Sequence, residues 1–243
     1  MGKVTVVGIG PGKFEGMTME ADEAIRKADI IVGYKKYVEL VMPHYEGKEF
    51  FDNGMRQEEV RCREALKMAS EGKDVALVCS GDSCVYGMAG LVYQLAPEFE
   101  NVEVSAIPGV TAALSGSSVL GAALGHDFAV ISLSDLLTPW ELIVKRLDAC
   151  AMADMCIALY NPGSHKRTDY LKKACDVLLR HKAPETVCGT VNNIGREGQC
   201  AKTMTLAELR DTPVDMFTTV FIGNSATKII DGKMVTPRGY RIG

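Results

Sequence analysis

Short apolar segments that end in glycine or proline constrain the fold of this chain more than any other feature. Three of them read VTVVGIGPG at 4–12, VALVCSGD at 75–82 and VSAIPGVTA at 104–112. β-Branched runs of this length, each stopped by a turn former, are typical of buried parallel strands. The turns that follow such strands meet at one edge of the sheet, where open α/β sheets bind ligands. We therefore expect the three turns to lie together and to form one binding rim.

The order of strand-like and helix-like segments predicts an α/β fold. In the first half, strands at 3–9, 29–33, 75–80 and 102–107 alternate with helices at 18–28, 34–42, 55–71 and 88–98, which indicates a mostly parallel sheet covered by helices. A helix of small residues follows at 111–124. The pattern restarts after 125 with strands at 128–133, 155–160, 186–191 and 217–222 and helices at 139–152, 168–181 and 206–210. We expect two α/β domains, 1–125 and 126–243, and a hairpin in the tail at 232–240.

Composition argues against several classes of function. Asp and Glu number 31 against 27 Lys and Arg, and the absence of an extended basic stripe disfavours a nucleic-acid-binding protein. The eight cysteines contain no C-x-x-C and the four histidines are scattered, so no metal site is expected. No apolar stretch approaches 18 residues and no signal peptide is recognisable, so we expect no membrane association and a reducing, cytoplasmic environment.

The first glycine turn partly matches a dinucleotide-binding fingerprint. Gly8 and Gly10 fit the first two positions of G-x-G-x-x-G, but the third falls on Lys13. Pro11 also removes an amide where a pyrophosphate needs a donor. No G-x-x-x-x-G-K-[ST] sequence is present either, so nicotinamide and nucleoside triphosphate binding are disfavoured.

Polar side chains follow several of the expected strands. Asp82 either projects into a cleft, where it binds a cationic ligand or moves a proton, or caps the next helix. In the second half, the turns contain SLSD at 132–135, YNPGS at 160–164 and NNIGR at 192–196. No serine or cysteine has a motif-level histidine partner. A rim of hydrogen-bonding groups without a nucleophile and base favours a reaction whose cofactor carries the reactivity, such as methyl transfer from a sulfonium.

These motifs resemble a known family in order and spacing. The runs GIGPG at 8–12, SGDS at 80–83 with VYG at 85–87, PGVTA at 108–112 and the turn at Tyr160 are similar to the tetrapyrrole (corrin/porphyrin) methylases, also called class III methyltransferases. The resemblance extends from about residue 3 to residue 240. Further runs resemble the branch that methylates C17 of precorrin-3B: ISLSDLLTPWE at 131–141, YNP at 160–162 with Ser164 and Arg167, GRE at 195–197 and TPRGY at 236–240. Cys84 departs from this branch, which often has glycine there.

The resemblance implies an activity and a cofactor. It implies methylation of C17 of a precorrin-3B or cobalt-factor III macrocycle by S-adenosylmethionine, with ring contraction, in cobalamin biosynthesis. It also implies two α/β domains with the cofactor in the cleft between them, and usually a homodimer. A sister corrin methyltransferase that acts at another ring carbon is the alternative. Outside this class, a nicotinamide-dependent oxidoreductase or a non-catalytic corrin carrier would give different products.

The resemblance also implies roles for individual residues. Those expected to contact the cofactor are Pro11, Ser80, Gly81, Asp82, Val85, Thr111, Ala112, Tyr160, Asn161, Asn193 and Ile194. Those expected to border the substrate trough are Gly8, Gly10, Gly12 and His126. Ring contraction needs proton movement, for which the catalytic candidates are Asp82, Ser132, Ser134 and Asp135, with His126 a further candidate by position.

Overall fold

The computed structural model describes residues 1–164 and 167–241, and the chain divides into two compact units, Met1–Ala112 and Ala113–Gly243. The division falls before the small-residue helix, which the sequence analysis placed in the first domain. The packing of that helix explains the difference. A Cβ on Gly116 would lie 2.5 Å from the ring of Phe221, so this helix packs closely against the sheet of the second unit.

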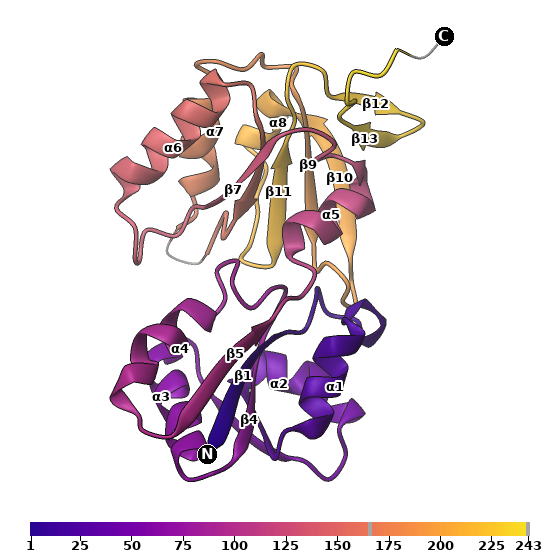
Figure 1. Cartoon of the computed structure of the whole chain (residues 1–243). Coiled ribbons are helices and arrows are strands. Elements are labelled where there is room, and N and C mark those ends of the chain that lie inside the picture. The colour runs from indigo at the N-terminus through magenta and orange to yellow at the C-terminus, as the bar shows by residue number, and fades with distance from the viewer. Residues whose placement is uncertain (165–166, 242–243) are drawn as a thin grey trace. The chain divides into compact units, whose positions relative to one another are not determined.

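The first unit is a parallel five-stranded sheet between two pairs of helices (Figure 1). Its helices cover the two faces because neighbouring residues of a strand point to opposite sides: Ile31 packs with α1 and α2, whereas Ile30 and Val32 pack with α3 and α4. The strand order is β3-β2-β4-β1-β5, so the carboxyl ends of all five strands lie at one edge. The elements are β1 (Gly2–Gly8), α1 (Met19–Lys27), β2 (Ile30–Tyr34), α2 (Lys35–Val41), β3 (Glu49–Asn53), α3 (Glu58–Ser70), β4 (Asp74–Cys79), α4 (Ala89–Leu95) and β5 (Val102–Ile107).

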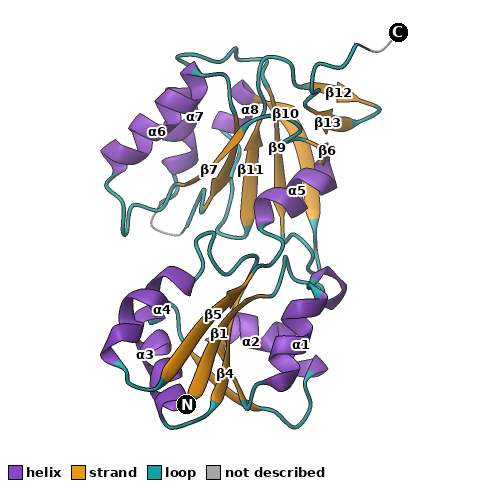
Figure 2. Ribbon diagram, viewed as in Figure 1, coloured by secondary structure: helices purple, strands orange, loops and turns teal. Residues whose placement is uncertain are grey.

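The second unit has a mixed five-stranded sheet in the order β10-β9-β11-β8-β7 (Figure 2). In this sheet β7 and β8 pair in parallel, whereas β8 with β11, β11 with β9 and β9 with β10 are antiparallel. The elements are α5 (Ala112–Leu120), β6 (Gly121–Ala122), β7 (Phe128–Ser132), α6 (Trp140–Met152), β8 (Cys156–Tyr160), α7 (Tyr170–Leu178), β9 (Val187–Asn192), β10 (Cys200–Thr205), α8 (Leu206–Arg210), β11 (Thr218–Ile222), β12 (Lys228–Ile230) and β13 (Lys233–Val235).

The structure adds strands that the sequence pattern did not indicate. β3 and β10 are edge strands, and β10 is mostly exposed, so neither shows a long apolar run. The small-residue helix ends at Leu120 instead of 124 because Gly121 has φ of +134°, a conformation that ends helices. The expected tail hairpin lies earlier, at 228–235, with Asp231 and Gly232 both at positive φ in its two-residue turn.

The carboxyl-terminal hairpin is fastened to the segment that follows α5. β13 pairs with β6, and the amide of Thr236 donates to the carbonyl of Ala122 at 3.0 Å. The Thr236 hydroxyl donates to the carbonyl of Ala123 at 2.7 Å and lies 2.8 Å from the hydroxyl of Thr227. Thr236, the first residue of the TPRGY motif, therefore holds the small sheet in place.

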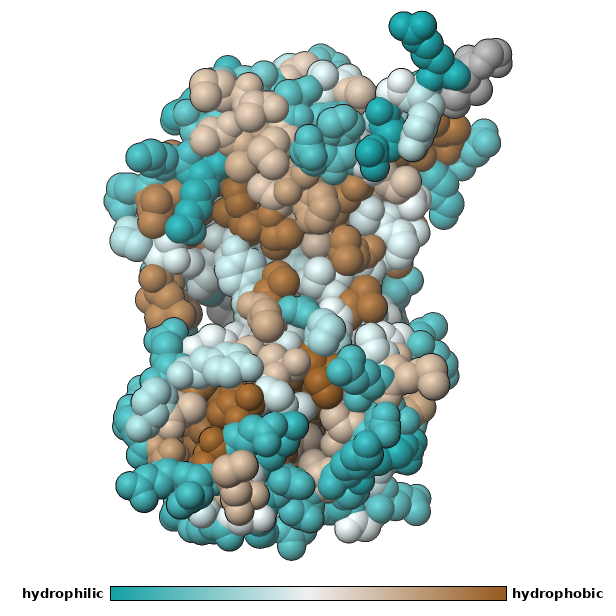
Figure 3. All heavy atoms as spheres, viewed as in Figure 1, coloured by the Kyte–Doolittle hydropathy of each residue, from teal (hydrophilic) through white to brown (hydrophobic). Residues whose placement is uncertain are grey.

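The surface mixes polar and apolar residues (Figure 3). In the first unit, brown apolar atoms are visible on this face where Figure 1 places the edge strand β5, whose valines are only partly buried. Within the described part of the chain, every helix is too short or too polar to cross a membrane.

Candidate functional site

The three glycine turns of the first unit meet, as the sequence predicts. The amide of Gly10 donates to the carbonyl of Gly81 at 3.0 Å, and the amide of Gly81 donates back to Gly10 at 2.7 Å. A Cβ on Gly109 would lie 2.1 Å from the carbonyl oxygen of Gly81 and 2.6 Å from the backbone of Gly8. Glycine is required at position 109 because the main chains of the three turns are in direct contact there. We call residues 8–12, 80–85 and 108–111 the glycine rim.

Asp82 fastens this rim with its carboxylate. Oδ1 accepts from the amides of Cys84 and Val85 at 2.8 Å each, and Oδ2 accepts from the amide of Gly109 at 3.0 Å. Burial alone would raise the pKa of Asp82, but the hydrogen bonds from Gly109, Val85 and Cys84 outweigh it and hold the pKa below its usual value. Asp82 does not cap the next helix, because α4 begins at Ala89 and its N-cap residue, Met88, makes no side-chain cap hydrogen bond. The carboxylate instead closes the turn 82–85 and ties it to the turn after β5.

The rest of the glycine rim presents partly accessible residues around this buried carboxylate. Val85 is 39% exposed, and Tyr86, which directly follows the rim, is 58% exposed at φ of +55°. Pro11 and Thr111 are half-buried. A Cβ on Gly81 would lie 3.6 Å from the Cα of Thr111, so the conformation of Gly81 at φ of +70°, and not its space, demands glycine.

The second unit gathers its polar turns at one edge of its own sheet. β7, β8 and β9 end at this edge with Ser132, Tyr160 and Asn192, and the antiparallel β11 begins there with Thr218. We call residues 132–135, 160–164, 167–170 and 192–196 the polar rim. Residues 165 and 166, between two of these ranges, lie outside the described residues. The SLSD, YNPGS and NNIGR turns are therefore neighbours in this unit.

Side-chain hydrogen bonds connect the turns of the polar rim. Asn161 Nδ2 donates to Ser132 Oγ at 2.9 Å, and the same hydroxyl accepts from the amide of Ser134 at 3.2 Å. Asn161 and Asn193 both lie in the left-handed region, at φ of +53° and +51°. Asparagine tolerates this conformation better than most residues, which explains its place after two strands.

Arg167 and Tyr170 complete this network around Asp135. Arg167 Nη1 donates to Ser134 Oγ at 2.6 Å and forms a 3.5 Å ion pair with Asp135. Tyr170 donates its hydroxyl to Asp135 Oδ2 at 2.6 Å, and its ring lies 4.6 Å from that of Trp140. The hydrogen bond from Tyr170, aided by the charge of Arg167, holds the pKa of Asp135 below its usual value. Sequence reasoning missed Tyr170, because a tyrosine at the start of a helix carries no motif.

Two further residues expected at the cofactor also have structural contacts. Tyr160 Oη accepts from the amide of Ala113 at 2.7 Å, which satisfies a first-turn donor of α5. Ile194 is buried, and its Cδ1 lies 3.0 Å from where a Cβ on Gly116 would stand. The polar rim and α5 are thus held together within the second unit.

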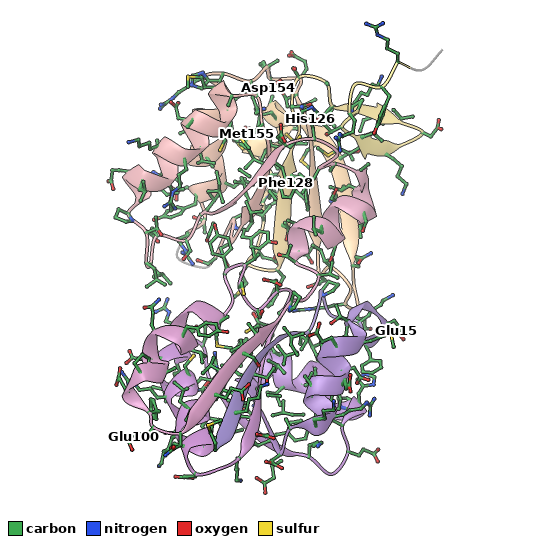
Figure 4. All side chains as sticks on the ribbon, viewed as in Figure 1. Glu15, Glu100, His126, Phe128, Asp154 and Met155 are labelled. Atoms are coloured by element: carbon green, nitrogen blue, oxygen red, sulfur yellow. The ribbon has the colours of Figure 1, made fainter. Side chains whose placement is uncertain are left out.

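The structure does not bring His126 to the polar rim. His126 precedes the first residue of β7, whereas Ser132 is its last residue, so the two residues lie at opposite ends of this strand. Figure 4 labels His126 and Phe128 with Asp154 and Met155, near the amino-terminal ends of β7 and β8. His126 Nδ1 accepts from the amide of Asp127 at 2.8 Å, and its side chain is 46% exposed. Among the described residues, no three His, Cys, Asp or Glu side chains are placed to hold a metal ion.

Comparison with known proteins gives matches over nearly the whole chain. The probable cobalt-factor III C(17)-methyltransferase of Salmonella typhimurium is 46% identical over 98% of this chain and 100% of its own length. The cobalt-factor III methyltransferase of Priestia megaterium is 45% identical over 99% of this chain, which spans only 45% of that longer relative.

The fold comparison agrees. The crystal structure of the methyltransferase CobJ superimposes with a TM-score of 0.90 at 36% identity, over 98% of this chain and 100% of that one. The model of the family described as Tetrapyrrole (Corrin/Porphyrin) Methylases matches residues 3–210, which include the glycine rim and the polar rim. This chain belongs to the tetrapyrrole (corrin/porphyrin) methylase family.

Proposed function

We propose that this chain transfers a methyl group from S-adenosylmethionine to C17 of cobalt-factor III and contracts the macrocycle, as a step of cobalamin biosynthesis. The observation that carries the proposal is the 46% identity over the full length of a relative named as a probable cobalt-factor III C(17)-methyltransferase. The two rims support it, because they offer many hydrogen-bonding groups of the kind that orient a cofactor.

The residues present fit such a cofactor. S-Adenosylmethionine supplies an electrophilic methyl group, so the protein has to align the reacting carbon and exclude water. Val85 is exposed and Pro11 and Thr111 are half-buried, so the glycine rim has groups that a ligand can reach. We assign the cofactor contacts to Pro11, Ser80, Gly81, Asp82, Val85, Thr111 and Ala112 in the first unit and to Tyr160, Asn161, Asn193 and Ile194 in the second.

The two aspartates act by positioning. Both have a pKa below the usual range, so both stay ionised at neutral pH and are poor proton donors. Asp82 holds the turn 82–85 against Gly109, and Asp135 is held by Tyr170 and Arg167. We place Gly8, Gly10 and Gly12 beside the macrocycle, and we assign to the hydroxyls of Ser132 and Ser134 the hydrogen bonds that orient its reacting edge.

A labelling experiment tests the proposed activity. The protein is incubated with cobalt-factor III and S-adenosylmethionine that carries a ¹³C methyl group, and the product is examined by mass spectrometry and NMR. We expect one labelled methyl group at C17 of a contracted macrocycle. A label at another ring carbon would indicate a sister methyltransferase, and consumption of a nicotinamide cofactor without methyl transfer would contradict the proposal.

A pair of serine variants links this activity to the polar rim. Ser132→Ala removes the hydroxyl that accepts from Asn161 and is expected to slow methyl transfer. Ser70→Ala, at the exposed end of α3, is the matched control and is expected to leave the rate unchanged. Equal rates in the two variants would remove Ser132 from the site.

We propose a homodimer in a reducing, cytoplasmic compartment. The family resemblance supports the dimer; α5 does not, because its Gly116 packs against Phe221 of the same unit. Burial raises the pKa of Cys79 to about 12, as expected of an unreactive thiol. Light scattering at micromolar concentration tests the dimer. The domain boundary at 125 stays a prediction, for which limited proteolysis is the test.

A further inference from the structure

Arg61 is a buried cation whose hydrogen-bonding partners are all neutral. It lies in the first turn of α3 and is 2% exposed. Its Nε donates to Asn53 Oδ1 at 2.8 Å, Nη2 donates to the carbonyl of Gly54 at 3.0 Å, and Nη1 lies 3.4 Å from the sulfur of Met88. The guanidinium carbon is 5.8 Å from the ring centroid of Tyr34. Burial of a charge is costly unless an opposite charge compensates it.

Two acidic groups of this unit are engaged elsewhere. Glu59, on the same turn of α3, pairs with Arg63 at 3.0 Å. Asp82, the buried carboxylate of this unit, accepts from three main-chain amides. Among the described residues, no carboxylate oxygen lies within 4.0 Å of the Arg61 guanidinium. The positive charge is therefore left without a partner inside the protein.

The position of Arg61 explains why such a charge is retained. Tyr34 ends β2, Asn53 ends β3, and Met88 directly precedes α4, so the guanidinium lies beneath the carboxyl edge of the parallel sheet. The glycine rim lies at the same edge, since β1, β4 and β5 end there. Ligands of open α/β sheets bind at this edge. A fixed positive charge at that place attracts an anionic ligand group.

We propose that Arg61 selects the substrate by attracting one of its carboxylates to the carboxyl edge of the first unit. The inference rests on the proposed function, since a corrin precursor carries acetate and propionate side chains. Arg61 is a positioning residue, because it is buried and its guanidinium contacts Asn53, Gly54 and Tyr34. Its charge acts on the ligand without direct contact, through protein atoms that screen the field less than water does.

Binding measurements on Arg61→Met test the proposal. Cobalt-factor III and S-adenosylhomocysteine are titrated separately against the wild-type protein, Arg61→Met and Arg63→Met, the last being an exposed arginine of the same helix. We expect Arg61→Met to weaken macrocycle binding about tenfold at low salt, to leave S-adenosylhomocysteine binding unchanged and to flatten the salt dependence of macrocycle binding. Arg63→Met is expected to bind both ligands as the wild type does.

Stability separates this role from a structural one. Because a neutral side chain of similar size removes an uncompensated charge, Arg61→Met is expected to unfold at the same temperature as the wild type or higher. Macrocycle binding within about twofold of the wild type, or equal loss of both ligands, overturns the proposal. If Arg61→Met does not fold, Arg61→Lys decides: it keeps the charge, so retained macrocycle binding supports the proposal and a loss of about tenfold overturns it.

A second probe separates this inference from the proposed function. If the wild-type protein neither binds nor methylates cobalt-factor III, the proposed substrate is wrong. The same titrations with uroporphyrin III, another tetrapyrrole with many carboxylates, then test Arg61 by itself. Binding that is equally tight in the wild type and in Arg61→Met overturns the role of Arg61.

Discussion

The glycine rim and the polar rim do similar work by different means. In the first unit, three turns are joined main chain to main chain, with Gly10 bonded to Gly81 and Gly109 against both Gly81 and Gly8. In the second unit, the turns are joined by side chains, chiefly those of Asn161, Arg167 and Tyr170. The two rims should therefore respond to different substitutions. A larger side chain in place of a glycine should disrupt the glycine rim, and the loss of a hydrogen-bonding side chain should disrupt the polar rim.

The largest effect is expected for Gly109→Ala. The added Cβ would lie 2.1 Å from the carbonyl oxygen of Gly81 and 2.6 Å from main-chain atoms of Gly8. The main chain of these turns would have to move apart to make room for it. We expect a loss of about 3 kcal/mol or more in the free energy of unfolding, measured by urea denaturation. Gly90→Ala is the control, since a Cβ there has no neighbour within 4 Å and α4 should gain up to about 1 kcal/mol. Equal stability of the two variants would contradict the close approach.

Asp82→Asn comes next, because the Asp82 carboxylate ties two turns of the glycine rim together. The neutral amide accepts more weakly than the carboxylate from Gly109, Val85 and Cys84, so we expect a loss of about 1.5 to 3 kcal/mol at pH 7. A weaker affinity for the cofactor should accompany it, because the turn 80–85 loosens.

The pH dependence of this loss follows from the direction of the pKa shift. The pKa of Asp82 is lowered in the folded state, so its contribution is complete above the unfolded value of about 3.9 and disappears as the pH falls through the folded value. Urea denaturation at pH 7 and at pH 3 should therefore show a smaller difference between Asp82→Asn and the wild type at pH 3. A difference that does not change with pH would assign the loss to shape instead of charge.

A smaller effect is expected at Asn161, where two substitutions separate the contribution of the main-chain conformation from that of the side chain. In Asn161→Ala, alanine has to adopt the unfavourable φ of +53°, so the free energy of unfolding should fall by about 1 kcal/mol. Asn161→Gly tolerates this conformation and should retain stability, yet both variants lose the hydrogen bond to Ser132. Equal slowing of methyl transfer in the two variants would show that the side chain acts in the reaction; normal rates in Asn161→Gly would limit Asn161 to a turn-forming role.

The smallest change in stability is expected for Tyr170→Phe, which removes the hydroxyl that donates to Asp135 at the surface of the second unit. Thermal unfolding should be unchanged, whereas methyl transfer should slow and S-adenosylhomocysteine affinity should stay the same. Because the two residues share one hydrogen bond, the double variant with Asp135→Asn should be no slower than the slower single variant. Tyr93→Phe, on an exposed position of α4, is the control. Additive slowing would mean that Tyr170 and Asp135 act separately.

The sequence predicts the backbone of this molecule better than its side-chain contacts. The runs at 75–82 and 104–112 correctly predicted β4, β5 and the contact between the turns that follow them, because a glycine directly after an apolar strand usually forms a turn. Edge strands β3 and β10 were missed since they bury little. The hydrogen bond between Tyr170 and Asp135 and the burial of Arg61 depend on packing across distant segments, which no local pattern contains. The assignments of cofactor and trough residues stay predictions.

The bond between the tail hairpin and the segment after α5 has a consequence for synthesis on the ribosome. Every strand of the first sheet precedes residue 108, so that unit can fold while the second is still being made. The second unit cannot close its small sheet until Met234 is available to Gly121 and Thr236 to Ala123. In nascent chains stalled before residue 228, the first unit should therefore resist protease, whereas β6 should lack its partner strand β13. Folding of the enzyme is then complete only after its last residues have been synthesised.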